Sequence, residues 1–128
     1  MVVRGWAPQL EVLRHVAVGG FLSHCGWNSV LEGLTSGTLI LGWPMEADQF
    51  VNARLLVEDL DVAVRVCEGD GTVPEPDELG RVIGETMGES GLEVRARAEE
   101  MRRKLVGSVT KGSSFADLER LVREVALI

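Results

Sequence analysis

Residues 20–36 combine a short apolar run, a polar turn that contains glycine, and a helical pattern. The apolar run at residues 20–22 predicts a buried strand. The helical pattern begins near Asn28 or Ser29, whose side chains are good caps for a helix N-terminus. A strand that leads through a tight turn into a helix presents unpaired backbone N–H groups to an anion. This stretch therefore favours an α/β unit with a candidate anion site at the turn.

Glu32 extends this candidate site along the helix. It lies four residues after Asn28 and three after Ser29, so a helix places all three side chains on one face. At ~1.5 Å of rise per residue, its carboxylate lies about 6 Å below the helix tip. That is close to the span from a nucleotide's phosphate to its ribose hydroxyls, from which a carboxylate can accept. Two interpretations stay open, a nucleotide site and a capped helix with a surface glutamate, and these residues alone favour the second.

The rest of the chain alternates between strand and helix patterns. The predicted strands lie near residues 2–4, 20–23, 39–42 and 62–66. The predicted helices cover residues 7–15, 28–36, 48–56, 77–87, 91–106 and 115–125. Asp48 is expected to cap the third helix, and His15 is expected in the last turn of the first. Strands that alternate with helices favour a parallel α/β sheet, which the three closing helices would wrap.

The composition excludes several classes of protein. With 128 residues, 45% of them hydrophobic and 26% charged, the chain has room for one globular domain. The formal net charge of −7 argues against nucleic acid or an anionic membrane as the main partner. No apolar stretch reaches the roughly 18 residues of a membrane span, and no signal-peptide layout opens the chain. We therefore expect a cytoplasmic protein without stable membrane insertion.

Cys25 and Cys67 bear on redox state and metal binding. They lie in or beside apolar runs without CxxC spacing, which predicts reduced, buried thiols rather than a disulfide framework. The spacings of the His and carboxylate residues offer no metal-ligand set. A dinucleotide-binding module would also alternate strands and helices, but no GxGxxG follows a predicted strand here.

Four groups of residues stand at the spacing of a known signature. They are Trp6-Ala7-Pro8-Gln9, His24-Cys25-Gly26-Trp27-Asn28-Ser29, Glu32 and Asp48-Gln49. At this spacing the chain resembles plant secondary-product UDP-glycosyltransferases (family 1, GT-B fold), whose donor-binding box has the same 44-residue length. The resemblance continues through residues 50–54 and the last predicted helix, so it covers essentially the whole chain. Residues 43–50 are most similar to enzymes that glycosylate flavonoids and small phenolic acids.

The resemblance implies an α/β fold and a domain assignment. Residues 1–128 would form part of the Rossmann-like, UDP-sugar-binding C-terminal domain, with a short parallel sheet, flanking helices and a helical C-terminus. Residues 6–49 would be its donor-binding box. The N-terminal acceptor domain, which carries the family's His–Asp general base, is expected to be absent, and with it every catalytic residue. We therefore expect a C-terminal fragment that is inactive alone.

The resemblance also implies roles at the nucleoside end of a UDP-sugar. Trp6 would stack on the uracil, and the backbone of Ala7 would bond the uracil edge. Gln9 would reach the ribose region. Glu32 would accept hydrogen bonds from both ribose hydroxyls. Taken together, these roles favour the nucleotide interpretation of Glu32 that its position alone left open.

The phosphate end would be held around the turn before the second predicted helix. His24, Asn28 and Ser29, with the backbone N–H groups of the turn at Gly26, would bind the diphosphate. Trp27 would line the sugar-phosphate region. Taken without the resemblance, His24 is only a histidine at the end of a strand and has a structural interpretation.

Asp48 and Gln49 would bind the sugar hydroxyls. In the family that the chain resembles, a glutamine as the last residue of the box, here Gln49, is associated with glucose donors. The implied reaction is inverting hexosyl transfer, from UDP-glucose to a hydroxyl of a flavonoid or small phenolic. The UDP-sugar is then a co-substrate, and the resemblance implies no cofactor and no metal. The alternative is a non-catalytic UDP-sugar-binding or interaction fragment that pairs with a separate acceptor lobe.

Overall fold

Three parallel strands form one sheet at the centre of the molecule. The structure is a computed structural model, and it describes residues 2–127. The strands are β1 (Gly20–Ser23), β2 (Leu39–Gly42) and β3 (Ala63–Arg65), in the order β1-β2-β3. In the register of the sheet, Gly20 is opposite Leu39 and Ile40 is opposite Ala63. Parallel pairing requires a crossover between successive strands, and helices supply both crossovers.

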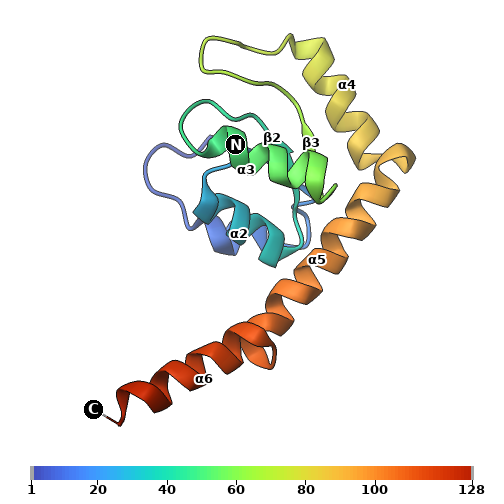
Figure 1. Ribbon diagram of the computed structural model, residues 1–128. Coiled ribbons are helices and arrows are strands. Elements are labelled where there is room, and N and C mark those ends of the chain that lie inside the picture. The colour runs from blue at the N-terminus through green and yellow to red at the C-terminus, as the bar shows by residue number, and fades with distance from the viewer. Residues whose placement is uncertain (1, 128) are drawn as a thin grey trace.

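Helices account for most of the remaining chain. They are α1 (Gln9–Leu13), α2 (Trp27–Ser36), α3 (Gln49–Arg54), α4 (Pro76–Met87), α5 (Leu92–Thr110) and α6 (Ser113–Val125). A π-helical turn at Leu55–Asp59 continues α3, and a 3₁₀ turn at Glu89–Gly91 joins α4 to α5. Figure 1 shows α6 reaching away from the sheet towards the C-terminus. Among residues 2–127, no helix combines the length and hydrophobicity that crossing a membrane requires.

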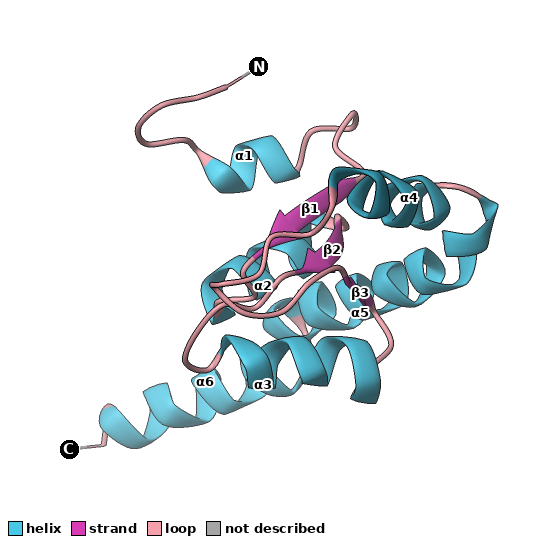
Figure 2. Ribbon diagram, turned by 90° about the horizontal axis from the view of Figure 1, so that it is seen from above, coloured by secondary structure: helices cyan, strands magenta, loops and turns pink. Residues whose placement is uncertain are grey.

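Helices cover both faces of the sheet (Figure 2). On one face, Gly33 brings α2 close to β2, because a Cβ built at Gly33 would lie 3.1 Å from Cγ1 of Ile40. On the other face, Met87 at the end of α4 lies over β1, and its Cε would be 3.5 Å from a Cβ at Gly20. The core joins the sheet to α2, α3 and α5 through Cys25, Val30, Leu34, Leu39, Ile40, Ala53, Leu56, Val62, Ala63, Val94 and Ala98.

The structure confirms most of the predicted elements and corrects two. Strands are present near 20–23, 39–42 and 62–66, but the strand predicted at residues 2–4 is wrong. Val2 and Val3 are 84% and 58% exposed, and no described strand lies beside them to accept their backbone hydrogen bonds. The first helix ends at Leu13, so His15 lies beyond it, where its Nδ1 accepts from the N–H of Ala17 at 3.2 Å.

Cys25 and Cys67 are both free thiols, but only Cys25 is buried. The prediction of burial is wrong for Cys67, because it lies in the loop that follows β3 at the surface. Burial raises the pKa of the Cys25 thiol above its ordinary value of 9.0, although the N–H of Trp43 and the charge of Arg65 act in the opposite direction. The neutral thiol is therefore the form that the fold stabilises. That stabilisation is complete below the ordinary thiol pKa and is lost as pH rises above it.

Alkylation of the folded chain is expected to distinguish the two cysteines. The thiolate is the reactive form, and access is required as well, so iodoacetamide at neutral pH should label Cys67 and spare Cys25. In concentrated urea both should be labelled. Mass spectrometry of the proteolytic peptides measures each site, and labelling of Cys25 at the rate of Cys67 in the folded chain would contradict this expectation.

Candidate functional site

Two groups of predicted site residues follow the carboxyl ends of two neighbouring strands. Residues 24–26 follow β1, and residues 43–48 follow β2. The helices α2 and α3 begin at this same edge of the sheet. In open α/β sheets the ligand site lies outside the carboxyl ends of the strands, where helix N-termini converge. The chain topology therefore places the motifs where a ligand of this fold class binds.

The turn between β1 and α2 holds Cys25 in a left-handed conformation. Its φ of 64° is uncommon for a residue with a side chain. Both sides of the residue are bonded: its N–H donates to Ser23 Oγ at 3.1 Å, and its carbonyl accepts from Asn52 Nδ2 at 3.0 Å. These bonds hold a conformation that would otherwise relax, and such backbone strain concentrates at functional sites.

Gly26 is the N-cap of α2, so the predicted capping by Asn28 or Ser29 is wrong. The extended conformation of Gly26 starts the helix one residue earlier, at Trp27. No side chain caps the helix, and the first N–H groups of an α-helix have no intrahelical acceptor. Asn28 and Ser29 instead lie in the first turn, at the positive end of the helix dipole. The candidate anion site would therefore consist of backbone donors.

The exposed His24 side chain lies over Gly26. A Cβ built at Gly26 would lie 2.5 Å from His24 Nε2, closer than real Cβ contacts come. Glycine at this position therefore allows the imidazole to lie beside the N-terminus of α2. The structure in this way brings His24 close to the backbone donors of the turn, which is the proximity that the family resemblance implies.

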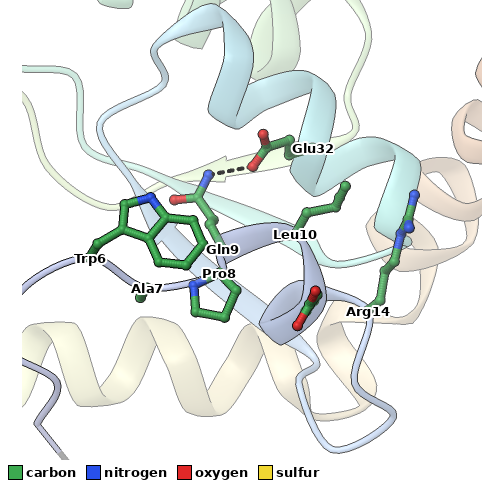
Figure 3. Close-up of a pocket in the computed structure, with 8 residues that line it drawn as sticks. Trp6, Ala7, Pro8, Gln9, Leu10, Arg14 and Glu32 are labelled. Carbon is green, nitrogen blue, oxygen red and sulfur yellow. Dashed lines mark hydrogen bonds between the residues drawn. The ribbon is translucent and has the colours of Figure 1, made fainter.

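A pocket of about 500 Å³ opens between α1 and α2 (Figure 3). It is lined by Trp6, Ala7, Pro8, Gln9, Leu10, Glu11, Arg14 and Glu32. The Trp6 ring is 87% exposed and free to stack on a planar group. Gln9 Nε2 donates to Glu32 Oε2 at 2.8 Å and lies 3.4 Å from Ser29 Oγ. Residues from two separate motifs thus meet in one pocket.

Sequence reasoning missed two charged residues of this pocket. Glu11 and Arg14 lie on or next to the short helix α1, three residues apart, and both line the pocket. Their i,i+3 spacing could have indicated that Glu11 and Arg14 approach the same side of the first helix as each other. The lining does not include His24, Trp27, Asn28, Asp48 or Gln49, which lie outside this pocket.

Asp48 and Gln49 make their own contacts at the start of α3. Asp48 occupies the predicted N-cap position of α3, but its side chain makes no capping bond, because its Oδ2 accepts from Asn52 Nδ2 at 2.8 Å and not from the helix backbone. Gln49 Oε1 accepts from the N–H groups of Met45 and Glu46, each at 3.0 Å. The amide oxygen of Gln49 therefore holds the loop, and its NH₂ group is the part that can donate to a ligand.

Metal binding would need a cluster of ligating side chains. Within residues 2–127, no group of three or more His, Cys, Asp or Glu residues lies close enough together to hold an ion. The donors described above are instead backbone N–H groups, one imidazole and amide side chains. Such groups bind anions through hydrogen bonds and partial charges.

The sequence matches the family model for "UDP-glucoronosyl and UDP-glucosyl transferase" over residues 1–69. UDP-glycosyltransferase 89A2 of Arabidopsis thaliana is 75% identical over 97% of this chain and 27% of that protein. Flavonol 3-O-glucosyltransferase UGT89B1 of the same plant is 50% identical over 98% of this chain and 26% of that protein. The chain thus spans about a quarter of the length of these relatives, and it belongs to the UDP-glucoronosyl and UDP-glucosyl transferase family.

A solved structure agrees with this assignment. The crystal structure of Arabidopsis thaliana UGT89C1 in complex with UDP superposes with a TM-score of 0.87. It is 45% identical, over 96% of this chain and 29% of that one. The same protein has also been solved with UDP-L-rhamnose and with quercetin. The resemblance to family 1 plant enzymes and the expected α/β fold of a GT-B enzyme are therefore confirmed.

Proposed function

We propose that this chain is the donor-binding part of a UDP-dependent glycosyltransferase, with residues 6–49 as its donor-binding box. The observation that carries the proposal is the meeting of Trp6, Gln9 and Glu32 in one pocket, linked by the 2.8 Å hydrogen bond between Gln9 and Glu32. The residues that we propose bind the UDP-sugar are Trp6, Ala7, Gln9, His24, Gly26, Trp27, Asn28, Ser29, Glu32, Asp48 and Gln49.

The nucleoside would occupy the pocket between α1 and α2. Uracil would stack on the exposed face of Trp6, an interaction worth about 1–3 kcal/mol per base. The ribose hydroxyls would donate to Glu32, whose carboxylate has more acceptor positions than its bond to Gln9 uses. Gln9 would remain beside the ribose and hold the carboxylate in place.

The diphosphate would lie at the N-terminus of α2. The helix dipole contributes about 0.3–1 kcal/mol there, and up to about 2 kcal/mol when the site is partly buried. His24 over Gly26 adds a further donor. Because the chain carries a net charge of −7, an anion depends on these local donors rather than on the field of the whole molecule.

The reaction we propose is displacement with inversion at the anomeric carbon of the sugar. An acceptor hydroxyl oxygen forms the new bond to that carbon while the bond to the diphosphate oxygen breaks. The electron pair of the broken bond goes to the diphosphate, where the N–H groups at the start of α2 stabilise the growing charge. The base that takes the acceptor's proton is proposed to lie outside these 128 residues.

Glucose is the proposed donor sugar, and a hydroxyl of a flavonoid or small phenolic the proposed acceptor. Gln49 and the 50% identity to a flavonol 3-O-glucosyltransferase support this choice. UGT89C1, which was solved with UDP-L-rhamnose, makes rhamnose the second candidate. In either case Asp48 and Gln49 would contact the sugar hydroxyls.

Saturation-transfer NMR on the 128-residue chain tests the proposal. UDP and UDP-glucose are expected to receive saturation, strongest at the uracil protons, because Trp6 would stack on that ring. The sugar protons of UDP-L-rhamnose should receive less than those of UDP-glucose, and NAD should receive none. Incubation with UDP-glucose and a flavonol is expected to yield no glucoside by chromatography. NAD signals equal to those of UDP would overturn the proposed site, and glucoside formation would contradict the expected inactivity.

A further inference from the structure

Asn52 connects the two segments of the proposed site that follow β1 and β2. It lies on α3, and the residue is 9% exposed. Its Nδ2 donates to the carbonyl of Cys25 at 3.0 Å and to Asp48 Oδ2 at 2.8 Å. One buried amide group thus bonds both the turn before α2 and the carboxylate at the start of α3. We propose that Asn52 is a positioning residue, which orients the sugar-contacting Asp48 relative to the diphosphate turn.

On the side of the turn, Asn52 determines the orientation of a peptide group. The carbonyl of Cys25 points at Asn52, and a trans peptide places the following N–H on the opposite side of its plane. The N–H of Gly26 therefore points away from Asn52. It adds a donor to those at the start of α2. Without the bond to Asn52, the left-handed Cys25 would keep its bonds to Ser23, from its N–H to Oγ and from its thiol to the carbonyl oxygen, but its own carbonyl would lose its partner.

On the side of α3, Asn52 fixes an exposed carboxylate. Asp48 makes no capping bond to the helix backbone, so its rotamer depends on the bond from Asn52 four residues later. That bond uses Oδ2 and leaves Oδ1 to accept from a sugar hydroxyl. Both protons of the Asn52 amide are then in use, one for each acceptor, so the group cannot turn without losing a bond.

This inference rests on the proposed function, because a positioning role requires a UDP-sugar to position. A purely structural role for Asn52, as a link between α3 and the turn, predicts something different. Loosening a structural link would weaken the binding of the whole ligand. Loss of positioning at Asp48 would weaken the sugar contacts more than the uracil contacts, which lie in the pocket between α1 and α2.

The Asn52→Asp variant separates these roles, because it keeps the shape of the side chain but faces both acceptors with an oxygen. In saturation-transfer NMR with UDP-glucose, the ratio of glucose to uracil signals should fall, and in competition the affinity for UDP-glucose relative to that for UDP should fall about 3- to 10-fold, as for the loss of one oriented hydrogen bond. The control is Arg54→Gln on the same helix. It breaks an exposed pair with Glu58 and should leave the ratio unchanged.

The double variant Asp48→Asn with Asn52→Asp reverses the donor and acceptor of the pair. It should recover most of the ratio of glucose to uracil signals, while total saturation stays below that of the native chain because the Cys25 carbonyl remains unbonded. If Asn52→Asp does not fold, the double variant and Asn52→Ala replace it in the comparison. An unchanged ratio in Asn52→Asp, whether both signals persist or both fall by the same factor, overturns the positioning role. Absence of saturation in the native chain overturns the proposed function and this inference with it.

Discussion

Glu32→Ala is expected to abolish the preference of this chain for UDP over 2′-deoxy-UDP. In the native chain the Glu32 carboxylate would accept from both ribose hydroxyls, and 2′-deoxy-UDP lacks one of them. Hydrogen bonds to a charged group contribute about 1.5–3 kcal/mol, so the loss of Glu32 should weaken UDP about 10- to 100-fold. The variant should bind the two nucleotides equally, because neither can then use the missing carboxylate.

The matched control is Glu11→Ala. Glu11 lines the same pocket, but the proposed binding assigns it no contact with ribose. Competition between the two nucleotides in saturation-transfer NMR measures the preference in each variant. If Glu32→Ala still prefers UDP, Glu32 does not bind the ribose. The nucleotide interpretation of its position on α2 would then be wrong.

Ile40→Ala is expected to produce the largest loss of stability. Ile40 is 0% exposed in the central strand β2, where it is opposite Phe21 on β1 and Ala63 on β3. Truncation of a buried Ile leaves a cavity and costs about 2–5 kcal/mol. A domain of this size has a total free energy of unfolding of about 5–15 kcal/mol, so the loss is a large share of it. The urea midpoint followed by circular dichroism should fall accordingly.

Val51→Ala serves as the control for this measurement. Val51 is 69% exposed on α3, and its truncation removes a comparable side chain from the surface. The free energy of unfolding is expected to change by no more than about 0.5 kcal/mol. Equal midpoints for Ile40→Ala and the native chain would mean that the contact of α2 with the sheet, through Gly33 and Ile40, does not stabilise the fold.

Local patterns predicted most of the fold because they report on short-range preferences. The continuous apolar run at residues 39–42 is buried at every position of β2, as expected for a central parallel strand. Gly37 ends α2 with a φ of 76°, a left-handed conformation that suits glycine. The strand predicted at residues 2–4 was wrong because strand formation depends on a distant partner and not on short-range preferences. A strand requires a partner, and a run of β-branched residues cannot indicate whether one is present.

The candidate site was likewise predicted in part from sequence patterns and decided in part by the tertiary structure. The resemblance carried by Trp6, Gln9, Glu32 and Asp48 implied a nucleotide-sugar site, which stays a prediction, and the structure shows that the turn before α2 follows β1. The N-cap was misplaced, because Asn28 and Ser29 have capping side chains while the backbone conformation of Gly26 starts the helix. No sequence signal indicated that Asn52, a polar residue in an apolar helical pattern, would bond two loops at once.

By itself, the sequence determined the family of this chain, the order of most of its strands and helices, and the residue types that we propose bind a UDP-sugar. These are properties of residue identity and spacing, which periodicity and motif carry directly. Only the tertiary structure decided that Gln9 reaches Glu32 and that Asn52 joins Cys25 to Asp48. Such contacts depend on how α1 and α3 pack against the turn before α2. Packing of segments more than twenty residues apart is a property of the folded core, and no local pattern records it.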